Sequence, residues 1–248
     1  DCSITILCTP VVFLLSSSFP QLTRMTPKNR AIMPNNDNIR FFMFFCLLLL
    51  NYFFFLCFKG QRYVFIFENR GDVVGVTMPH PHGQIYGYSV IPKKLQLEME
   101  SCKEHFDETH NCLICDMLED EMNCGDRIIM ENEDFVTFLP FFSEYPYGMY
   151  IAAKRHVQNL SQLTDSEKTN LAKILKETTG TFDSLFDYKF PYMMCMYQNP
   201  VNGEDVSDYY HFHIAFYPPM RSADKIKYNA SSETGAWAHC NTTAPEAM

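Results

Sequence analysis

The sequence predicts an α+β fold, an antiparallel sheet with flanking helices. Short segments rich in β-branched and aromatic residues recur between turn residues along residues 61–248. Helical periodicity occurs in only a few separate places. Many strands combined with few, segregated helices are typical of the α+β class. The expected strands span residues 63–68, 73–78, 84–91, 127–131, 135–139, 147–153, 192–198 and 209–217.

Three segments have helical patterns. Residues 93–106 alternate apolar and charged residues at helical spacing, and residues 112–122 form a shorter helix that opens on Cys112. The longest expected helix spans residues 164–186. It starts with Thr164 as N-cap and Glu167 three residues later, the spacing of a capping box.

Composition argues against nucleic-acid binding and favours a reducing cellular environment. The net charge of −9 gives the chain no basic footprint for nucleic acid. An anionic ligand must therefore be held locally, by backbone N–H groups and a few side chains. The ten cysteines are scattered, apart from the pair Cys112 and Cys115. This usage favours metal binding over a disulfide framework, and with it a reducing, cytoplasmic location.

Residues 1–60 differ in composition from the rest of the chain. Residues 41–58 are almost purely apolar, and Arg40 and Lys59 flank them. At roughly 18 residues this run reaches the lower limit for a membrane-spanning helix. A second interpretation is favoured: phenylalanine and leucine codons are rich in pyrimidines, so the run matches a translated intron end. Membrane association is expected only if residues 41–58 are genuine protein.

The most informative motif is Pro79-His80-Pro81-His82-Gly83-Gln84. In a strand, alternate side chains share a face, so His80, His82 and Gln84 are expected to point the same way. A neutral imidazole is a good nucleophile toward phosphorus, which makes His82 a candidate catalytic residue. Gln84 can donate hydrogen bonds to phosphate oxygens but cannot act as a general acid. Because a sugar phosphate leaves as a stable anion, an amide favours transfer between phosphates over hydrolysis.

A similar pair, His211 and His213, occurs in the second part of the chain. Upstream of it lie Cys112, Cys115 and His156, which together with His211 have the ligand types of a closed tetrahedral Cys₂His₂ zinc site. The first histidine pair has no such cysteines after residue 61. The expected division is residues 1–60, an incomplete first repeat at 61–108, and a second repeat at 109–248.

These residues resemble the active-site signature of the galactose-1-phosphate uridylyltransferase family, a transferase branch of the histidine-triad superfamily. Further segments that match the family in order are Phe67-Glu68-Asn69-Arg70-Gly71, Gly75-Val76-Thr77-Met78, Phe190-Pro191-Tyr192, Phe216-Tyr217-Pro218-Pro219 and Glu233-Thr234-Gly235. The resemblance extends from about residue 61 to the C-terminus. It implies that both repeats, 61–108 and 109–248, are histidine-triad-like and that the second ends in a C-terminal hexose-loop segment.

The resemblance implies a ping-pong reaction. UDP-glucose would transfer UMP to His82 and release glucose 1-phosphate, and galactose 1-phosphate would then accept the UMP. The resemblance also implies roles for other residues: His80 as a zinc ligand beside the nucleophile, and a homodimer in which a C-terminal stretch contacts the hexose phosphate of the partner subunit. The implied substrate-binding residues are Asn69, Thr77, Gln84, Lys227, Tyr228 and Glu233.

The chain departs from the family pattern in two respects. The first-half C-x-x-C that would share zinc with His80 has no counterpart here, so this chain is expected to be inactive by itself. Glu98 and His213 match two positions of a second metal site in some members, but Tyr197 and Ala215 stand at the other two. The simpler expectation for Glu98 is a charge on an exposed helix face.

Simpler alternatives stand beside each site. His82 could be a surface strand histidine, His80 a solvated side chain, the cysteines free thiols, and His211 and His213 ordinary sheet histidines. Two other functions also remain open. One is a different histidine-triad nucleotidyltransferase or phosphorylase, and the other is a non-catalytic, zinc-stabilised fragment.

Overall fold

The computed structural model describes residues 60–76, 82–186, 188–239, 241 and 243–247. The apolar run at 41–58 and two expected site residues, Thr77 and His80, lie outside the described residues. Among the described residues, no helix combines the length and the hydropathy needed to cross a membrane.

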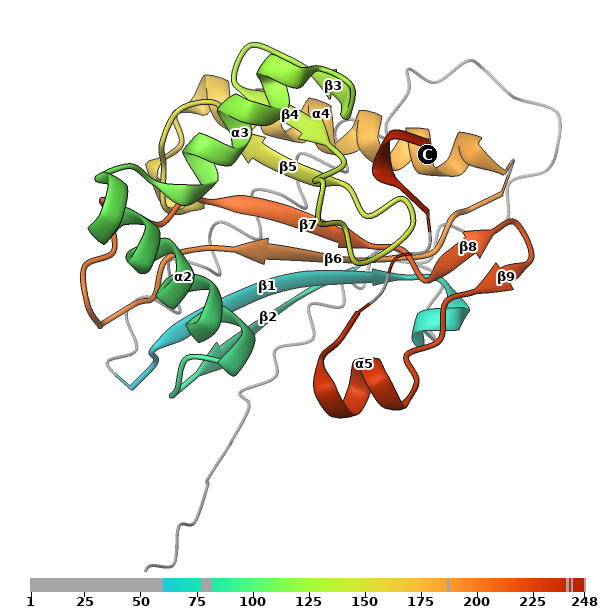
Figure 1. The fold of residues 1–248 in the computed structure, drawn as a ribbon, viewed down its shortest axis with the longest axis horizontal. Helices are drawn as coiled ribbons and strands as arrows, with labels where there is room; N and C mark the ends of the chain where they lie inside the picture. The colour runs from blue at the N-terminus through green and yellow to red at the C-terminus, as the bar shows by residue number, and fades with distance from the viewer. Residues whose placement is uncertain (1–59, 77–81, 187, 240, 242, 248) are drawn as a thin grey trace, which may run out of the picture.

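A seven-stranded antiparallel sheet forms the centre of the molecule (Figure 1), which confirms the predicted α+β class. Its strand order is β2-β1-β6-β7-β5-β4-β3, so the second expected unit (β3 to β7) lies beside the remnant of the first (β1 and β2). The strands are β1 Tyr63–Arg70, β2 Gly83–Tyr88, β3 Ile128–Glu131, β4 Phe135–Phe138, β5 Tyr150–Ala153, β6 Tyr192–Tyr197 and β7 His213–Tyr217.

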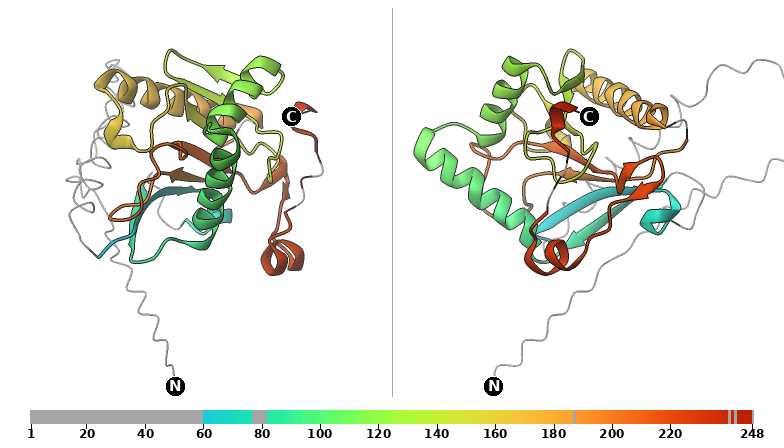
Figure 2. Two further views of the ribbon diagram at one scale, coloured as in Figure 1. Left: turned by 60° about the vertical axis from the view of Figure 1, so that its left-hand side comes forward. Right: turned by 45° about the vertical axis from the view of Figure 1, so that its right-hand side comes forward.

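Helices cover both faces of the sheet (Figures 1 and 2). Helix α4, Asp165–Leu185, packs Leu171, Ile174 and Phe182 against one face. Helices α2, Lys93–Thr109, and α3, Leu113–Cys124, lie on the other face. The remaining elements are the short helix α5 Ser231–Ala236, the strands β8 Met220–Ser222 and β9 Lys225–Ile226, and the 3₁₀ turns η1 Asp72–Val74, η2 Leu160–Gln162 and η3 Pro245–Ala247.

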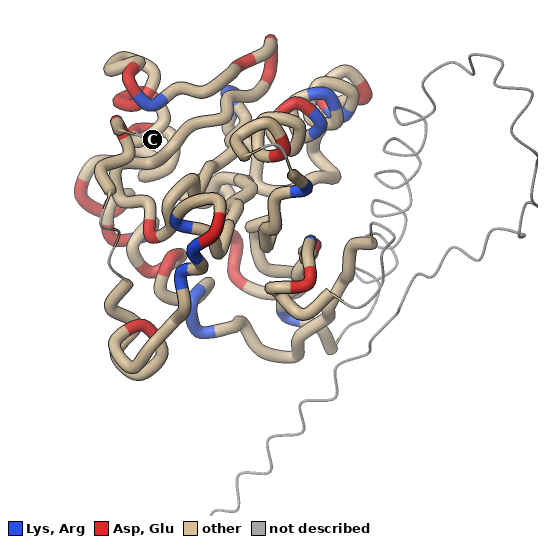
Figure 3. Tube along the Cα trace, turned by 90° about the vertical axis from the view of Figure 1, so that its right-hand side faces the viewer, with Lys and Arg blue, Asp and Glu red and all other residues tan. Residues whose placement is uncertain are grey.

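Acidic and basic positions lie on the same helices and loops rather than on separate faces (Figure 3).

The sheet has an internal two-fold relation centred on the pairing of β1 with β6. Phe67 lies opposite Cys195, and the neighbouring pairs are Ile66 with Met196 and Glu68 with Met194. Exchanging the two strands about the central pair therefore returns the same register.

The relation extends to the outer neighbours of both strands. Phe67 also lies opposite Gln84 of β2, and Cys195 also lies opposite Ala215 of β7. Gln84 and Ala215 are thus counterparts. Two residues before each stand His82 and His213, so this choice of central pair is the one that aligns the two histidine pairs of the sequence. Because any antiparallel pair of strands keeps its register on such an exchange, the alignment rests on the sequence and not on the register.

The expected strand at 73–78 is wrong over its described part. Residues Asp72–Val74 form a 3₁₀ turn, bounded by Gly71 at φ 99° and Gly75 at φ 82°. Only glycine adopts such angles readily, so the two glycines turn the chain despite the valines between them. The expected strand at 209–217 is shorter than predicted, because regular pairing begins only at His213.

The predicted start of α4 is confirmed. The Thr164 side chain accepts a hydrogen bond from the Glu167 backbone N–H, and the Glu167 carboxylate accepts one from the Thr164 backbone N–H. Arg155 also donates to Glu167, at 2.8 and 2.9 Å, and thereby links the end of β5 to this helix.

We expect Thr164→Ala to lower the free energy of unfolding by about 1 kcal/mol, because one helix N–H loses its acceptor. Urea denaturation followed by circular dichroism measures this change. Thr164→Ser keeps the acceptor oxygen and should unfold at nearly the parent midpoint. An alanine variant as stable as the serine variant would contradict the assigned cap.

Candidate functional site

Four side chains from three separate segments form a compact cluster. Ligand atoms of Cys112, Cys115, His156 and His211 all lie within 4.8 Å of one another. Cys112 is the residue just before α3 and Cys115 lies in its first turn, so both sulfurs face the same side of the helix start. His156 follows β5 and His211 precedes β7, two strands that pair in the sheet.

The hydrogen bonds of this cluster orient its ring nitrogens inward. The Cys115 sulfur lies 3.2 Å from Nδ1 of both His156 and His211. Nε2 of His156 lies 2.8 Å from the carbonyl oxygen of Ser207, so this nitrogen carries the proton and Nδ1 offers its lone pair to the cluster. Two thiols and two imidazoles at these distances are the donor set of a closed tetrahedral metal site.

The electrostatics of the cluster favour the ligand forms of Cys112 and His211, whereas hydrogen bonding to Cys112 raises the pKa values of Cys115 and His156. The Cys115 thiol, and then the imidazoles of His156 and His211, lower the pKa of Cys112. Burial lowers the pKa of His211, which is fully inaccessible to solvent, and keeps its ring neutral. A thiolate and a neutral imidazole are the forms that bind metal. The Cys₂His₂ combination predicted from the sequence is therefore brought together by the fold.

Glu98 is not a solvated charge on an exposed helix face, as the sequence suggested. The Tyr210 hydroxyl donates to Glu98 at 2.7 Å, and the nearest imidazole nitrogen of His213 lies 3.6 Å away. This helix position therefore faces two buried residues, Tyr210 and His213, and leaves the Glu98 side chain 24% exposed.

His213 is held by aromatic side chains. Its ring stacks on Tyr197 with a centroid distance of 4.8 Å and on Tyr150 at 5.6 Å. Its Nδ1 lies 3.0 Å from the backbone oxygen of His211. Glu98 and His213 are thus neighbours, as a shared metal site would require. However, the rings of Tyr197 and Tyr150 stack on the imidazole of His213 and take the place of further metal ligands.

The active-site strand contains the other predicted residues. His82 is half-buried immediately before β2, and Gln84 lies within the strand, where its side-chain oxygen accepts a hydrogen bond from the Tyr86 hydroxyl at 3.1 Å. Asn69 lies near the end of β1, on the strand that pairs with β2. Three of the predicted residues, His82, Gln84 and Asn69, therefore lie on neighbouring strands at one end of the pair.

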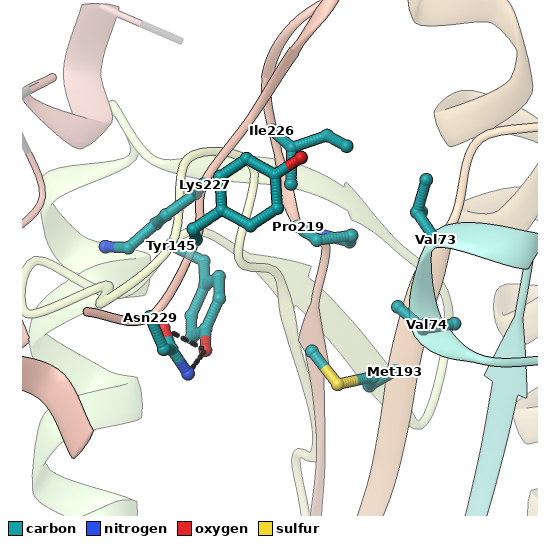
Figure 4. Close-up of a pocket in the computed structure, with 9 residues that line it drawn as sticks. Val73, Val74, Tyr145, Met193, Pro219, Ile226, Lys227 and Asn229 are labelled. Carbon is teal, nitrogen blue, oxygen red and sulfur yellow. Dashed lines mark hydrogen bonds between the residues drawn. The ribbon is translucent and has the colours of Figure 1, made fainter.

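Two of the predicted C-terminal residues, Lys227 and Tyr228, line a shallow cleft of about 210 Å³ (Figure 4). Lys227 is only 3% exposed and donates to the backbone oxygen of Glu144, whereas Tyr228 is 73% exposed. Val73 and Val74 from the turn after β1 face Lys227 and Tyr145 across the cleft. Glu233 lies outside the cleft and accepts a hydrogen bond from the Ala230 backbone N–H.

Comparison with protein families decides which class this site belongs to. The family model described as galactose-1-phosphate uridyl transferase, C-terminal domain, matches residues 98–229, which is more than half of the chain. The chain belongs to the galactose-1-phosphate uridyl transferase family. The N-terminal domain model of the same family matches residues 57–92.

Individual members of the galactose-1-phosphate uridyl transferase family agree with this assignment. The galactose-1-phosphate uridylyltransferase of Thermotoga maritima is 45% identical over 75% of this chain and 58% of its own length. The Haemophilus influenzae protein of the same name is 34% identical over 70% of this chain and 50% of its own length. The chain thus spans only about half the length of these relatives.

Solved structures show the same architecture. A uridylyltransferase structure superposes with a TM-score of 0.78 and 29% sequence identity, covering 84% of this chain and 65% of that one. An ADP-glucose phosphorylase from Arabidopsis thaliana shares the fold, with a TM-score of 0.70 at 20% identity over 84% of this chain and 63% of that one.

Sequence reasoning missed Glu68, which precedes Asn69 in the family motif. Burial raises the pKa of Glu68 to about 7, against smaller opposing effects of Tyr192, Arg70 and His82. The signal that could have found it is its place in Phe67-Glu68-Asn69-Arg70-Gly71, one of the segments that match the family.

We expect Glu68 to make the folded state less stable as pH rises. Because the folded pKa of about 7 exceeds the ordinary value of 4.5, the native state binds more protons between these pH values, and stability is lost as pH rises through this window. Glu68→Gln should therefore raise the melting temperature relative to the parent at pH 8, with a difference that shrinks toward pH 4.5.

Thermal melts of both proteins across this pH range measure the effect. Glu119→Gln changes an exposed carboxylate on α3 and serves as the control, with no pH-dependent gain expected. A difference between Glu68→Gln and the parent that stays constant with pH would contradict the assignment.

Proposed function

We propose that this protein is a UDP-glucose:hexose-1-phosphate uridylyltransferase of galactose metabolism that transfers UMP through a covalent bond to His82. One observation carries the proposal: the family's Pro-His-Pro-His-Gly-Gln signature places His82 directly before β2, beside Asn69 and Gln84 on adjacent strands. Family membership supports the reaction class.

The proposed first step is nucleophilic substitution at phosphorus. A ring nitrogen of His82 attacks the α-phosphorus of UDP-glucose, a nitrogen–phosphorus bond forms, and the bond from the α-phosphorus to the bridging oxygen breaks. Glucose 1-phosphate leaves with that oxygen. In the second step a phosphate oxygen of galactose 1-phosphate attacks the same phosphorus, UDP-galactose forms, and the electron pair returns to the His82 nitrogen.

Side chains near His82 would stabilise the charge on the phosphates. Gln84 has an amide N–H₂ group that can donate to a non-bridging oxygen, and its side-chain oxygen is already fixed by Tyr86. Asn69, and Thr77 from the segment before the signature, would hold the remaining phosphate oxygens. We assign the hexose phosphate contacts to Lys227, Tyr228 and Glu233, acting across a homodimer as the family resemblance implies.

We propose that the metal of the Cys112, Cys115, His156 and His211 cluster is zinc. Sulfur and imidazole donors with no remaining open position suit a structural zinc ion, which stabilises a fold rather than taking part in chemistry. His80 would occupy the corresponding ligand position of the first unit, because the repeat of His80 and His82 as His211 and His213 in the sequence makes it the counterpart of His211. We place the unit boundaries at 60/61 and 108/109 and the protein in the cytoplasm.

Loss of zinc should destabilise the second unit. We expect Cys112→Ser to lower both the zinc content and the melting temperature, because the binding energy of a structural metal contributes directly to folding. Metal analysis of the purified protein and thermal melts measure the two effects.

Cys124→Ser is the matched control, since this cysteine is exposed at the end of α3 and outside the cluster. Its zinc content and melting temperature should equal those of the parent. A Cys112→Ser protein that retains zinc and melts like the parent would show that the cluster is not a metal site.

The nucleophile is tested by intact mass. After brief incubation with UDP-glucose and an acid-free quench, the protein should gain the mass of one uridylyl group. His82→Gly should show no gain while melting at nearly the parent temperature, because His82 is only half-buried and its role is chemical.

Three other results would contradict the proposal. A gain that persists in His82→Gly would place the nucleophile elsewhere. A gain with ADP-glucose but not UDP-glucose would indicate a different nucleotidyltransferase or phosphorylase. No gain in a folded protein would support the competing expectation that the chain is inactive without the first-half pocket.

A further inference from the structure

One backbone carbonyl beside the metal cluster is close to two side-chain nitrogens. Nε2 of His156 lies 2.8 Å from the Ser207 carbonyl oxygen, and Nε2 of Gln158 donates to the same oxygen at 2.9 Å. A backbone carbonyl has two lone pairs, so it can accept both hydrogen bonds at once. Gln158 thus contacts the partner of a predicted ligand without being a member of the cluster.

The Ser207 carbonyl determines which nitrogen of His156 is available to a metal. Because a carbonyl oxygen only accepts, the imidazole nitrogen beside it carries the proton. The other nitrogen, Nδ1, keeps its lone pair and lies 3.2 Å from the Cys115 sulfur. Hydrogen bonds of this kind fix the tautomer and the ring orientation of metal-binding histidines. A Ser207 carbonyl that turned away would leave both unfixed.

The Ser207 carbonyl lies on a segment that is largely exposed. Ser207 is exposed in the loop between β6 and β7, and its N–H donates to the exposed Asp205 at 2.9 Å. A hydrogen bond at such a position competes with water, which lowers its net contribution. The second bond to Ser207 comes from the protein interior instead, because Gln158 is only 8% exposed.

The fold fixes Gln158 before its side chain reaches Ser207. Its backbone N–H donates to the Gln162 side-chain oxygen at 2.8 Å, and its backbone oxygen accepts from the Asn199 N–H at 3.0 Å. The next residue, Asn159, donates its side-chain N–H to the Asn199 side chain at 2.8 Å. Since the backbone is already ordered, little further freedom is lost when the amide donates to Ser207.

We propose that Gln158 is a positioning residue of the metal site, which acts on His156 through the Ser207 carbonyl. This inference rests on the zinc site proposed above. With the carbonyl fixed, the imidazole needs no change of tautomer or orientation to bind the ion, so Gln158 raises the affinity for zinc without contacting it. Loss of such an outer partner weakens metal binding by roughly ten- to a hundred-fold.

The test is the zinc affinity of the full chain, measured by competition with a chromophoric chelator. Gln158→Met replaces the amide by an apolar group of similar length and should weaken zinc binding by at least about ten-fold. Gln162→Met is the matched control. It removes a hydrogen bond to the backbone of Gln158 but leaves both bonds to the Ser207 carbonyl in place, so its zinc affinity should equal that of the parent.

The His156 ring gives a second readout that a general loss of stability would not change. In NMR spectra of the zinc-loaded parent, the Nε2 proton of His156 should exchange slowly with water, because the fixed carbonyl accepts it. This signal should persist in Gln162→Met and broaden or disappear in Gln158→Met.

Melting temperatures show whether each variant is folded. If Gln158→Met does not fold, Gln158→Asn takes its place. Asparagine keeps the amide but shortens the side chain by one carbon, so the amide no longer reaches Ser207, and zinc binding should weaken in the same way.

Two results would overturn the positioning role while leaving the metal site intact. One is a parent chain that binds zinc and a folded Gln158 variant that binds it equally well. The other is an equal loss of affinity in Gln158→Met and Gln162→Met, which would indicate a general loosening of this segment. A parent chain that binds no zinc would instead overturn the metal site, and this inference with it.

Discussion

Four side chains that could hold a metal ion converge from three segments of the chain. Cys112 and Cys115 lie at the start of α3, His156 lies after β5, and His211 lies at the entry to β7. Backbone bonds continue this convergence, since Phe212 donates to Val157 at 2.7 Å. The start of helix α3 and the ends of strands β5 and β7 therefore meet at this cluster of four side chains. His213, whose ring stacks on Tyr197 and Tyr150, follows His211 by two residues in the sequence.

The pairing of β1 with β6 joins this unit to the strands that carry the chemistry. Its two-fold register makes corresponding positions comparable, and the residue types differ in an informative way. Asn69 and Gln84 of the first unit correspond to Tyr197 and Ala215 of the second. Tyr197 covers His213 with its ring, while Ala215 offers no hydrogen bond. One scaffold thus presents a candidate nucleophile in the first unit and an enclosed imidazole in the second.

Much of this architecture can be predicted from the sequence, because strand composition and helix capping act over short distances. Thr164 and Glu167 are three residues apart, so their capping box is visible without the fold. The turn at Asp72–Val74 could not be predicted from its valines, since the left-handed angles of Gly71 and Gly75 override strand propensity. The contacts of Glu98 with Tyr210 and His213 also escape prediction. They join residues more than a hundred positions apart, and only tertiary packing shows that this face of α2 is covered.

The four residues of the candidate metal site could be predicted from the sequence, because metal ligands of this kind are cysteines and histidines. That their ligand atoms lie within 4.8 Å of one another could be seen only in the folded structure. The most direct test of the account is an anomalous difference map from crystals of the protein, collected at the zinc absorption edge. The account predicts one strong peak, which marks a zinc ion bonded to both cysteine sulfurs and to Nδ1 of His156 and of His211 in a tetrahedral arrangement. The absence of a peak among these four side chains, in crystals grown with zinc present, would contradict it.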